Sequence, residues 1–154
     1  MRRMITVFCS VVAFLASLLL LSPSAGAATA AYGCGGSLID SYPVKRGSST
    51  WGYVYLYYST ASNGTNCAVA VDTRFGTGTT KYMAISINRC VAGAQPGSWC
   101  NTDALDHDEG EFTTYAGPAK VTGTAARCVR FVGAMYNPAH TELARYEAWA
   151  VHCG

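Results

Sequence analysis

The sequence predicts an all-β domain, either a disulfide-stapled antiparallel β-sandwich or a small barrel. Short segments rich in aromatic and β-branched residues recur along residues 37–153, and Gly, Pro, Asn and Ser separate them. Six of the seven cysteines lie within residues 34–153, which is typical of small exported domains held together by disulfides. These two patterns together define the fold class.

Residues 1–27 have the features of a secretory signal peptide, with cleavage at that point or as late as residue 30. Two arginines precede an almost unbroken apolar run over residues 5–21, and small residues follow it. A retained membrane anchor is the alternative, since the run is near the lower length limit for a span. We expect residues 28–154 to form a single secreted β domain, free of the membrane after signal cleavage.

Removal of this signal leaves a chain without net charge. The full sequence has 11 Lys and Arg against nine Asp and Glu, and Arg2 and Arg3 leave with the signal, so nine of each sign remain. A protein that binds nucleic acid concentrates basic residues in a patch that collects phosphates. Here the basic residues are scattered singly, apart from Lys45 and Arg46. We therefore expect no nucleic-acid partner.

The cysteines indicate three disulfides. Cys9 leaves with the signal, and the even number that remains is typical of an exported disulfide framework. Cys90 and Cys100 enclose a short segment with a Pro-Gly turn, so a local bridge is expected there, stabilising by roughly 2–3 kcal/mol. The other four cysteines allow three connectivities, of which the pairing of sequence neighbours is favoured. Those neighbouring pairs are Cys34 with Cys67 and Cys128 with Cys153.

Residues 51–59 predict a strand near the middle of the sheet. Aromatic and β-branched residues dominate the segment, and side chains alternate between two faces along a strand. Both faces are largely apolar, because Val54, Leu56 and Tyr58 lie on one of them. The other face is predicted to be an aromatic stripe of Trp51, Tyr53, Tyr55 and Tyr57.

The other strands follow from the same alternation. Asn63-Gly64 tolerates the positive φ of a tight turn, so residues 66–72 are expected to form a hairpin with the preceding strand. Met83, Ile85 and Ile87 are expected to point into the core. The strand that ends at Cys90 is followed by a predicted loop up to Glu109, and residues 141–153 fit either helical or strand spacing. The predicted strands are residues 37–44, 51–59, 66–72, 80–90, 111–116, 119–123 and 127–135.

Several stretches carry a resemblance to a known family. Residues 53–58 followed by 66–69, the run Phe-Thr-Thr-Tyr-Ala-Gly-Pro within residues 109–118, and residues 127–129 and 152–154 carry it. They resemble the spore-associated protein A family, small secreted proteins of actinomycetes found with spores. The Cys90–Cys100 segment departs from the family's four-cysteine pattern, and the sequence between Met135 and Ala148 also drifts. The resemblance implies a location outside the cell and no catalytic residues.

The remaining motifs raise two chemical questions, whether the protein binds a metal ion and whether it is an enzyme. An acidic cluster suggests calcium, although its spacing fits no EF-hand and a solvated loop is the alternative. No G-x-S-x-G, H-E-x-x-H, phosphate loop or C-x-x-C pair is present, so we expect neither zinc, another cofactor nor an enzyme. A small hydrolase with two carboxylates across a cleft stays open. The calcium candidates are Asp103, Asp106, Asp108 and Glu109.

Among the features of the sequence, the aromatic stripe indicates a binding surface most directly. Each of its rings offers about 150–250 Å², so four exposed rings would exceed the roughly 300–600 Å² apolar patch of a typical monomer. The stripe is therefore either packed in the core or a platform for a ligand such as a glycan. We expect a secreted protein of the cell or spore surface that binds a cell-wall or spore-surface component. The alternatives are a carbohydrate-binding module working through the stripe and a protease inhibitor working through the Cys90–Cys100 loop.

Overall fold

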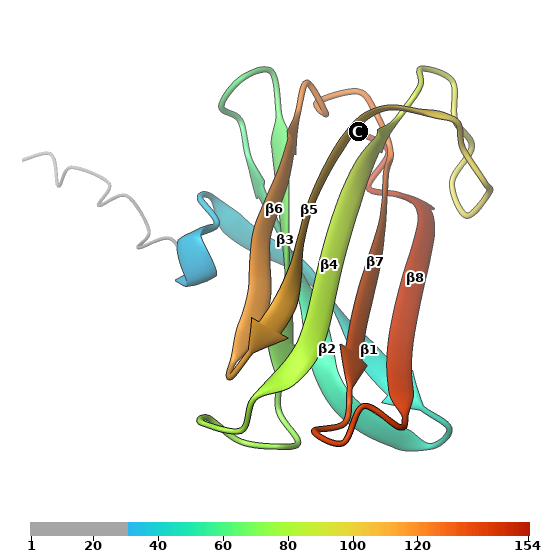
Figure 1. The fold of residues 1–154 in the computed structure, drawn as a ribbon. Coiled ribbons are helices and arrows are strands. Elements are labelled where there is room, and N and C mark those ends of the chain that lie inside the picture. The colour runs from blue at the N-terminus through green and yellow to red at the C-terminus, as the bar shows by residue number, and fades with distance from the viewer. Residues whose placement is uncertain (1–30) are drawn as a thin grey trace, which may run out of the picture.

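The computed structural model describes residues 31–154, which form one antiparallel sheet that curls into a barrel-like shape (Figure 1). The strand order is β5-β4-β7-β8-β1-β2-β3-β6, which confirms the predicted all-β class. The predicted signal peptide lies outside the described residues. Within residues 31–154, no helix is long and apolar enough to span a membrane. The elements are η1 (Ala31–Gly33), β1 (Ser37–Arg46), β2 (Ser49–Ser59), β3 (Thr65–Asp72), β4 (Lys81–Cys90), β5 (Thr102–Phe112), β6 (Tyr115–Thr122), β7 (Val129–Tyr136) and β8 (Leu143–Val151).

The two end strands of the sheet, β5 and β6, lie side by side and nearly close the barrel (Figure 1). Side chains rather than a backbone ladder join them. Asp108 Oδ2 accepts a hydrogen bond from the Gly117 amide at 2.7 Å, and Asp106 Oδ2 accepts one from the Lys120 amide at 2.8 Å. Hydrogen bonds to a charged acceptor are stronger than neutral ones. Two carboxylates therefore satisfy amides that an open sheet edge would leave unpaired.

The main core fills the inside of the curled sheet. Met83, Ile85 and Ile87 are all fully buried there, which confirms the prediction for β4. Each such side chain contributes about 1.5–3 kcal/mol relative to an exposed one. The space is so closely filled that a Cβ added at Gly133 of β7 would lie 2.2 Å from Val54 Cγ2 of β2. Only glycine fits at that position without displacing a neighbour.

A second apolar cluster lies on the outer face of β2 and β3. The short η1 segment covers it, and the Cys34–Cys67 disulfide fastens this segment to β3. As a result β3 is buried on both faces, with Val69 and Val71 packed outward and Ala68 and Ala70 packed inward. Position near the middle of the sheet was predicted for β2, and the order β1-β2-β3 confirms it.

The structure corrects the predicted loop before Glu109, which is mostly the strand β5. Its exposed and half-buried positions alternate, as in a strand with one face toward the protein. The side chains that point toward β6 include Asp106 and Asp108, which bind amides of that strand. The sequence of β5 therefore lacks the alternation of apolar and polar residues that predicted the other strands, although the segment forms a strand.

The predicted pair of strands after β5 is also corrected, and the segment that fitted either helix or strand is resolved. The predicted strands 111–116 and 119–123 are replaced by the end of β5, a short turn and a continuous β6 that passes through Pro118. Pro118 is exposed, and the pairing of β6 with β3 shifts register nearby, between Ala68 and Ala70. Residues 143–151 form a strand, not a helix, with small residues such as Ala144 and Ala148 facing inward.

One charged side chain, Lys81, is completely buried at the start of β4. Its Nζ lies 2.8 Å from Asp72 Oδ2 and donates hydrogen bonds to the carbonyls of Thr79 at 2.8 Å and Thr113 at 2.9 Å. Asp72 Oδ1 accepts hydrogen bonds from two backbone amides of the following loop. This ion pair thus ties together the end of β3, the β3–β4 loop and the β5–β6 turn.

Candidate functional site

The predicted aromatic stripe of β2 is divided between two environments. Trp51 is 3% exposed and belongs to the main core, where its ring meets Phe75 edge-on at 5.1 Å between centroids. The pairing with β1 shifts register between Val44 and Lys45, so Trp51 is the extra residue of a β-bulge and the alternation breaks there. The placement of Trp51 on one face with the tyrosines is therefore wrong. Tyr57 is on the outer face but only 7% exposed.

The two remaining members of the stripe are half-buried, and their rings stack with other aromatic rings. Tyr53 and Tyr55 stack with centroids 6.1 Å apart, and Tyr55 also stacks with Tyr32 of η1 at 6.2 Å. Tyr32 in turn meets the edge of Tyr115 at 5.1 Å. Burial raises the pKa of the Tyr55 hydroxyl above its usual value. These rings mainly cover the outer apolar cluster, which leaves little of the stripe free for a ligand.

A different pair of aromatic residues is exposed. Trp99, in the loop between β4 and β5, is 61% exposed, and Trp149 of β8 is 48% exposed. Their rings meet edge-to-face at 6.5 Å, and the guanidinium of Arg130 lies 3.9 Å from the centre of the Trp99 ring. We call these three residues the tryptophan edge. Large apolar side chains that are grouped and exposed in this way are typical of interaction surfaces.

The loop that carries Trp99 is fixed to the sheet at several points. The Cys90–Cys100 disulfide closes its base. The Val91 amide donates to the Asn101 carbonyl at 2.8 Å, and the Gly97 amide donates to the Ala150 carbonyl of β8 at 3.0 Å. Because these bonds position the loop before any partner arrives, Trp99 loses less entropy on binding than it would from a mobile loop.

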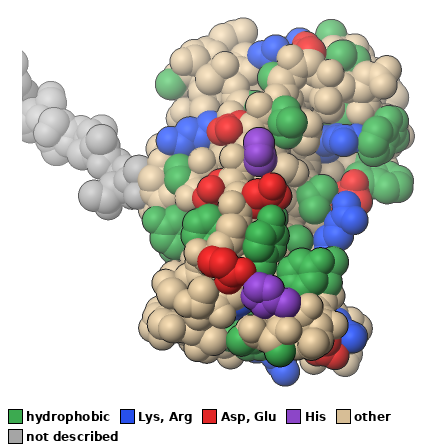
Figure 2. Space-filling view, viewed as in Figure 1, with side chains coloured by type: hydrophobic (Ala, Val, Ile, Leu, Met, Phe, Trp, Pro, Cys, Tyr) green, Lys and Arg blue, Asp and Glu red, His purple; other side chains and the backbone are tan. Residues whose placement is uncertain are grey.

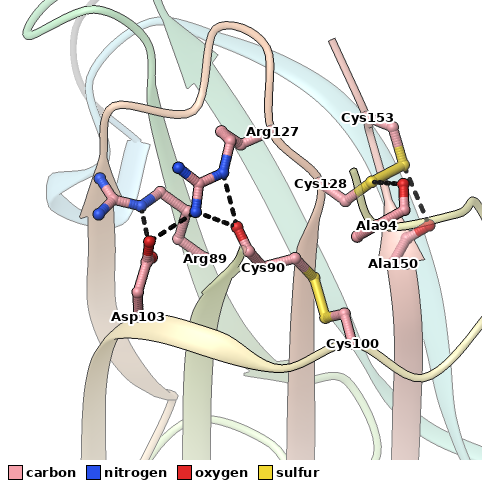
Figure 3. The surroundings of a disulfide bond; sticks show 9 residues. All are labelled: Arg89, Cys90, Ala94, Cys100, Asp103, Arg127, Cys128, Ala150 and Cys153. Carbon is pink, nitrogen blue, oxygen red and sulfur yellow. Dashed lines mark hydrogen bonds and ion pairs between the residues drawn. A yellow bond between two sulfur atoms is a disulfide. The ribbon is translucent and has the colours of Figure 1, made fainter. Parts of the chain in front are cut away.

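An arginine clamp supports the base of the same loop (Figure 3). Arg127 donates from Nε to the Cys90 carbonyl at 2.8 Å and from Nη2 to Asp103 Oδ2 at 2.6 Å. Arg89 donates from Nε to Asp103 Oδ1 at 2.9 Å. These hydrogen bonds from Arg89 and Arg127 lower the pKa of the Asp103 carboxyl. The clamp joins β4, the start of β5 and the β6–β7 loop.

A shallow groove of about 510 Å³ lies beside the tryptophan edge on the outer face of β5, β4, β7 and β8. Small residues of β4, such as Ala84 and Ser86, line its floor. One wall includes His107 and Glu109 of β5, and the other includes Arg145 of β8 together with Arg130. Figure 2 shows this face, with hydrophobic and basic side chains gathered at the right-hand edge and most acidic and histidine side chains nearer the middle.

One polar atom of the groove has no partner within residues 31–154. Arg130 Nη1 is buried beneath the surface and makes no hydrogen bond to any residue of this part of the chain. A buried donor without a partner is costly, so most such groups are satisfied in folded proteins. Arg130 therefore combines a stacking contact with Trp99 and an unused hydrogen-bonding capacity beside the groove.

The three disulfides are those that sequence neighbourhood favoured. Figure 3 shows two of them close together, near the ends of β4, β7 and β8. Cys128 lies in the same small apolar cluster as Cys90 and Cys100. The bridges therefore fasten the Trp99 loop and the C-terminal segment at one end of the barrel. The pairs are Cys34–Cys67, Cys90–Cys100 and Cys128–Cys153.

The structure does not bring the calcium candidates together. Asp103 is held by the arginine clamp, Asp106 and Asp108 bind amides of β6, and Glu109 lies in the wall of the groove. Within residues 31–154, no three His, Cys, Asp or Glu side chains are grouped so that they could hold a metal ion. The acidic residues of β5 act instead as structural acceptors and as groove-lining charges.

The tryptophan edge was not found from the sequence. Trp99 and Trp149 are 50 positions apart by number and meet only because the loop after β4 reaches β8. The nearest signal in the sequence is the Cys90–Cys100 segment, which includes Trp99 and for which an inhibitor loop is one of the expected alternatives. Trp149 lay in the segment whose secondary structure was ambiguous, so its exposed face was not identified.

Comparison with known proteins shows a relative of this chain. The chain is 36% identical over 130 residues to Spore-associated protein A of Streptomyces coelicolor, an alignment that covers 79% of this chain and 73% of that protein. No family model matches the sequence, and no solved structure matches the chain. The identity and its coverage establish the relationship that the sequence motifs indicated. The chain belongs to the spore-associated protein A family.

Proposed function

We propose that this protein acts outside the cell, at the spore or cell surface, by binding a surface component through the tryptophan edge and the adjoining groove. Its relative is named for association with spores, which supports the location. The observation that carries the proposal is the exposure of Trp99 and Trp149 on a loop and strand that are held rigidly. Tryptophan and arginine are the residues that most often dominate binding energy at interfaces.

A glycan is the class of ligand that suits this surface. Sugar rings combine apolar faces, which stack on tryptophan, with hydroxyl groups that need hydrogen-bonding partners. Arg130, Arg145 and Glu109 lie along the walls of the groove as charged partners, and Arg130 also stacks on Trp99. The sequence suggested the aromatic stripe of β2 as a carbohydrate-binding surface. We propose the outer face of β4, β7 and β8 for this role instead.

We propose that the protein binds its ligand and catalyses no reaction on it. The groove is a hollow open to the surface rather than an enclosed cavity. Chemical steps in enzymes are usually carried out in sites that exclude water, because electrostatic stabilisation is strongest there. We also do not extend the proposal to protease inhibition, since the Gly97 amide of the Trp99 loop is already bonded to β8.

Retention of the secreted protein on purified cell walls, chitin, cellulose, peptidoglycan and intact spores tests the proposal. Trp99→Ala and Trp149→Ala should each reduce retention by about tenfold or more, since central aromatic contacts are typically worth 2 kcal/mol or more, at about 1.4 kcal/mol per tenfold. Leu143→Ala, which removes an exposed apolar side chain elsewhere on β8, should leave it unchanged. Displacement by one free sugar would support the glycan class, whereas equal retention of all variants would reject this surface.

A further inference from the structure

A second concave site lies away from the tryptophan edge, at the end of the sheet where β2 ends and β3 begins. It is a pocket of about 390 Å³, within the range of roughly 300–1,000 Å³ typical of small-molecule sites. Most of its lining is apolar, and none of its residues belongs to the groove or the tryptophan edge. The lining residues are Ile39, Tyr58, Asn66, Ala125, His152 and Gly154.

Asn66, at the start of β3, is the unusual member of this lining. The residue is 1% exposed, and its side-chain Nδ2 makes no hydrogen bond to any of residues 31–154. A side-chain amide has two N–H donors, and buried polar groups are almost always paired. Asn66 lines the pocket, so an acceptor that reaches this buried nitrogen from the pocket would satisfy it, which favours a ligand with a carbonyl or hydroxyl oxygen.

A hydrogen-bonded group of side chains holds His152, another residue of the lining. His152 Nε2 lies 3.1 Å from the Tyr42 hydroxyl and 3.5 Å from Asp40 Oδ2. The hydrogen bond from Tyr42 lowers the pKa of the Asp40 carboxyl, so this carboxylate is charged at neutral pH. Its negative charge disfavours an anionic ligand, and the Asn66 donor cannot pair with an ammonium group. A neutral ligand fits both groups.

We propose that this pocket binds the N-acetyl group of a neutral N-acetylated sugar. The acetyl oxygen accepts a hydrogen bond from Asn66 Nδ2, and the methyl group packs against Ile39 and Ala125. The sugar ring lies against Tyr58, whose aromatic ring offers an apolar face. This site is independent of the groove: it would recognise a single sugar residue by its acetyl group, whatever polymer the tryptophan edge binds.

The test is a titration of the ¹⁵N-labelled full chain, purified as secreted with its disulfides intact, followed by NMR. N-acetylglucosamine should give saturable shifts of the Asn66 side-chain amide and of the Ala125 and Gly154 backbone amides. Glucose, which lacks the acetamido group, should give none of these shifts. Equal shifts with the two sugars, or no shift with either up to about 50 mM, would overturn the proposal, since even millimolar affinity is only about 4 kcal/mol.

Ala125→Phe provides the matched variant. Ala125 is exposed at the rim of the pocket, so the larger side chain should fill the pocket while leaving the melting temperature unchanged. The dissociation constant for N-acetylglucosamine should rise by about tenfold or more, and an unchanged constant would reject the site. The Trp99→Ala/Trp149→Ala chain should bind N-acetylglucosamine like the wild type, so a failure of the groove and a failure of the pocket remain distinguishable.

Discussion

Replacing Lys81 by methionine should be one of the most damaging single changes in the barrel. Lys81 and Asp72 have side chains that are 0% and 1% exposed, and the ammonium group also donates to two backbone carbonyls. Lys81→Met keeps the volume but leaves a buried carboxylate without its partner and two carbonyls without a donor. Breaking a buried pair from one side costs about 3–5 kcal/mol. For a domain of this size the melting temperature should fall by about 10–20 °C.

Urea unfolding of the oxidised protein at neutral pH, followed by tryptophan fluorescence, measures this loss. Lys120→Met, which removes an exposed lysine of β6, should change the free energy of unfolding by less than about 0.5 kcal/mol. Asp72→Asn combined with Lys81→Met should cost less than the sum of the two single changes, because the stranded charge is removed. A loss below about 1 kcal/mol for Lys81→Met would refute the assignment of a buried, structurally essential ion pair.

Three further predictions concern the core, the seam and the clamp. Gly133→Ala should destabilise by about 1–3 kcal/mol because the new Cβ would meet Val54 Cγ2 at 2.2 Å, whereas Gly35→Ala, with nothing within 4 Å, should be neutral in the same urea assay. Asp106→Ala/Asp108→Ala should speed hydrogen exchange at the β6 amides that these carboxylates bind, while the β2–β3 amides keep their protection. Unchanged exchange on β6 would argue against the side-chain seam. Asp103 has a lowered pKa in the folded state, so its contribution is present above the unfolded pKa of about 3.9 and is lost as the pH falls through the folded value. The unfolding midpoint of Asp103→Asn should therefore depend less on pH in the acid range than that of the wild type, and identical pH profiles would contradict the clamp.

Much of the fold could be predicted from patterns of neighbouring residues in the sequence. The alternation of Met83, Ile85 and Ile87 identified an inward strand face, and Asn63-Gly64 identified a hairpin, because both depend on neighbouring residues only. Cysteine spacing also pointed to the three bridges. Lys81 has the same parity as these β4 core residues, but the burial of this lysine was not predicted, because its partner Asp72 lies on another strand.

The missed features depend on contacts between distant segments. The inward carboxylates of β5 find their donors on β6, and Trp51 changes face because β1 pairs with β2 through a bulge. Trp99 meets Trp149 across a loop whose path is set by its docking on β8. No local pattern contains this information. For the same reason the binding surface that we propose, the tryptophan edge, differs from the aromatic stripe that the sequence suggested.

The most direct test of the central claim is the affinity of the Trp99→Ala/Trp149→Ala chain for intact spores and purified cell walls. Sedimentation of the secreted protein with each material, over a range of protein concentrations, gives the dissociation constant. We expect the double variant to bind at least about 30-fold more weakly than the wild type, with Leu143→Ala unchanged and all three chains equally stable. Equal dissociation constants for the wild type and the double variant would show that the tryptophan edge is not the surface by which this protein associates.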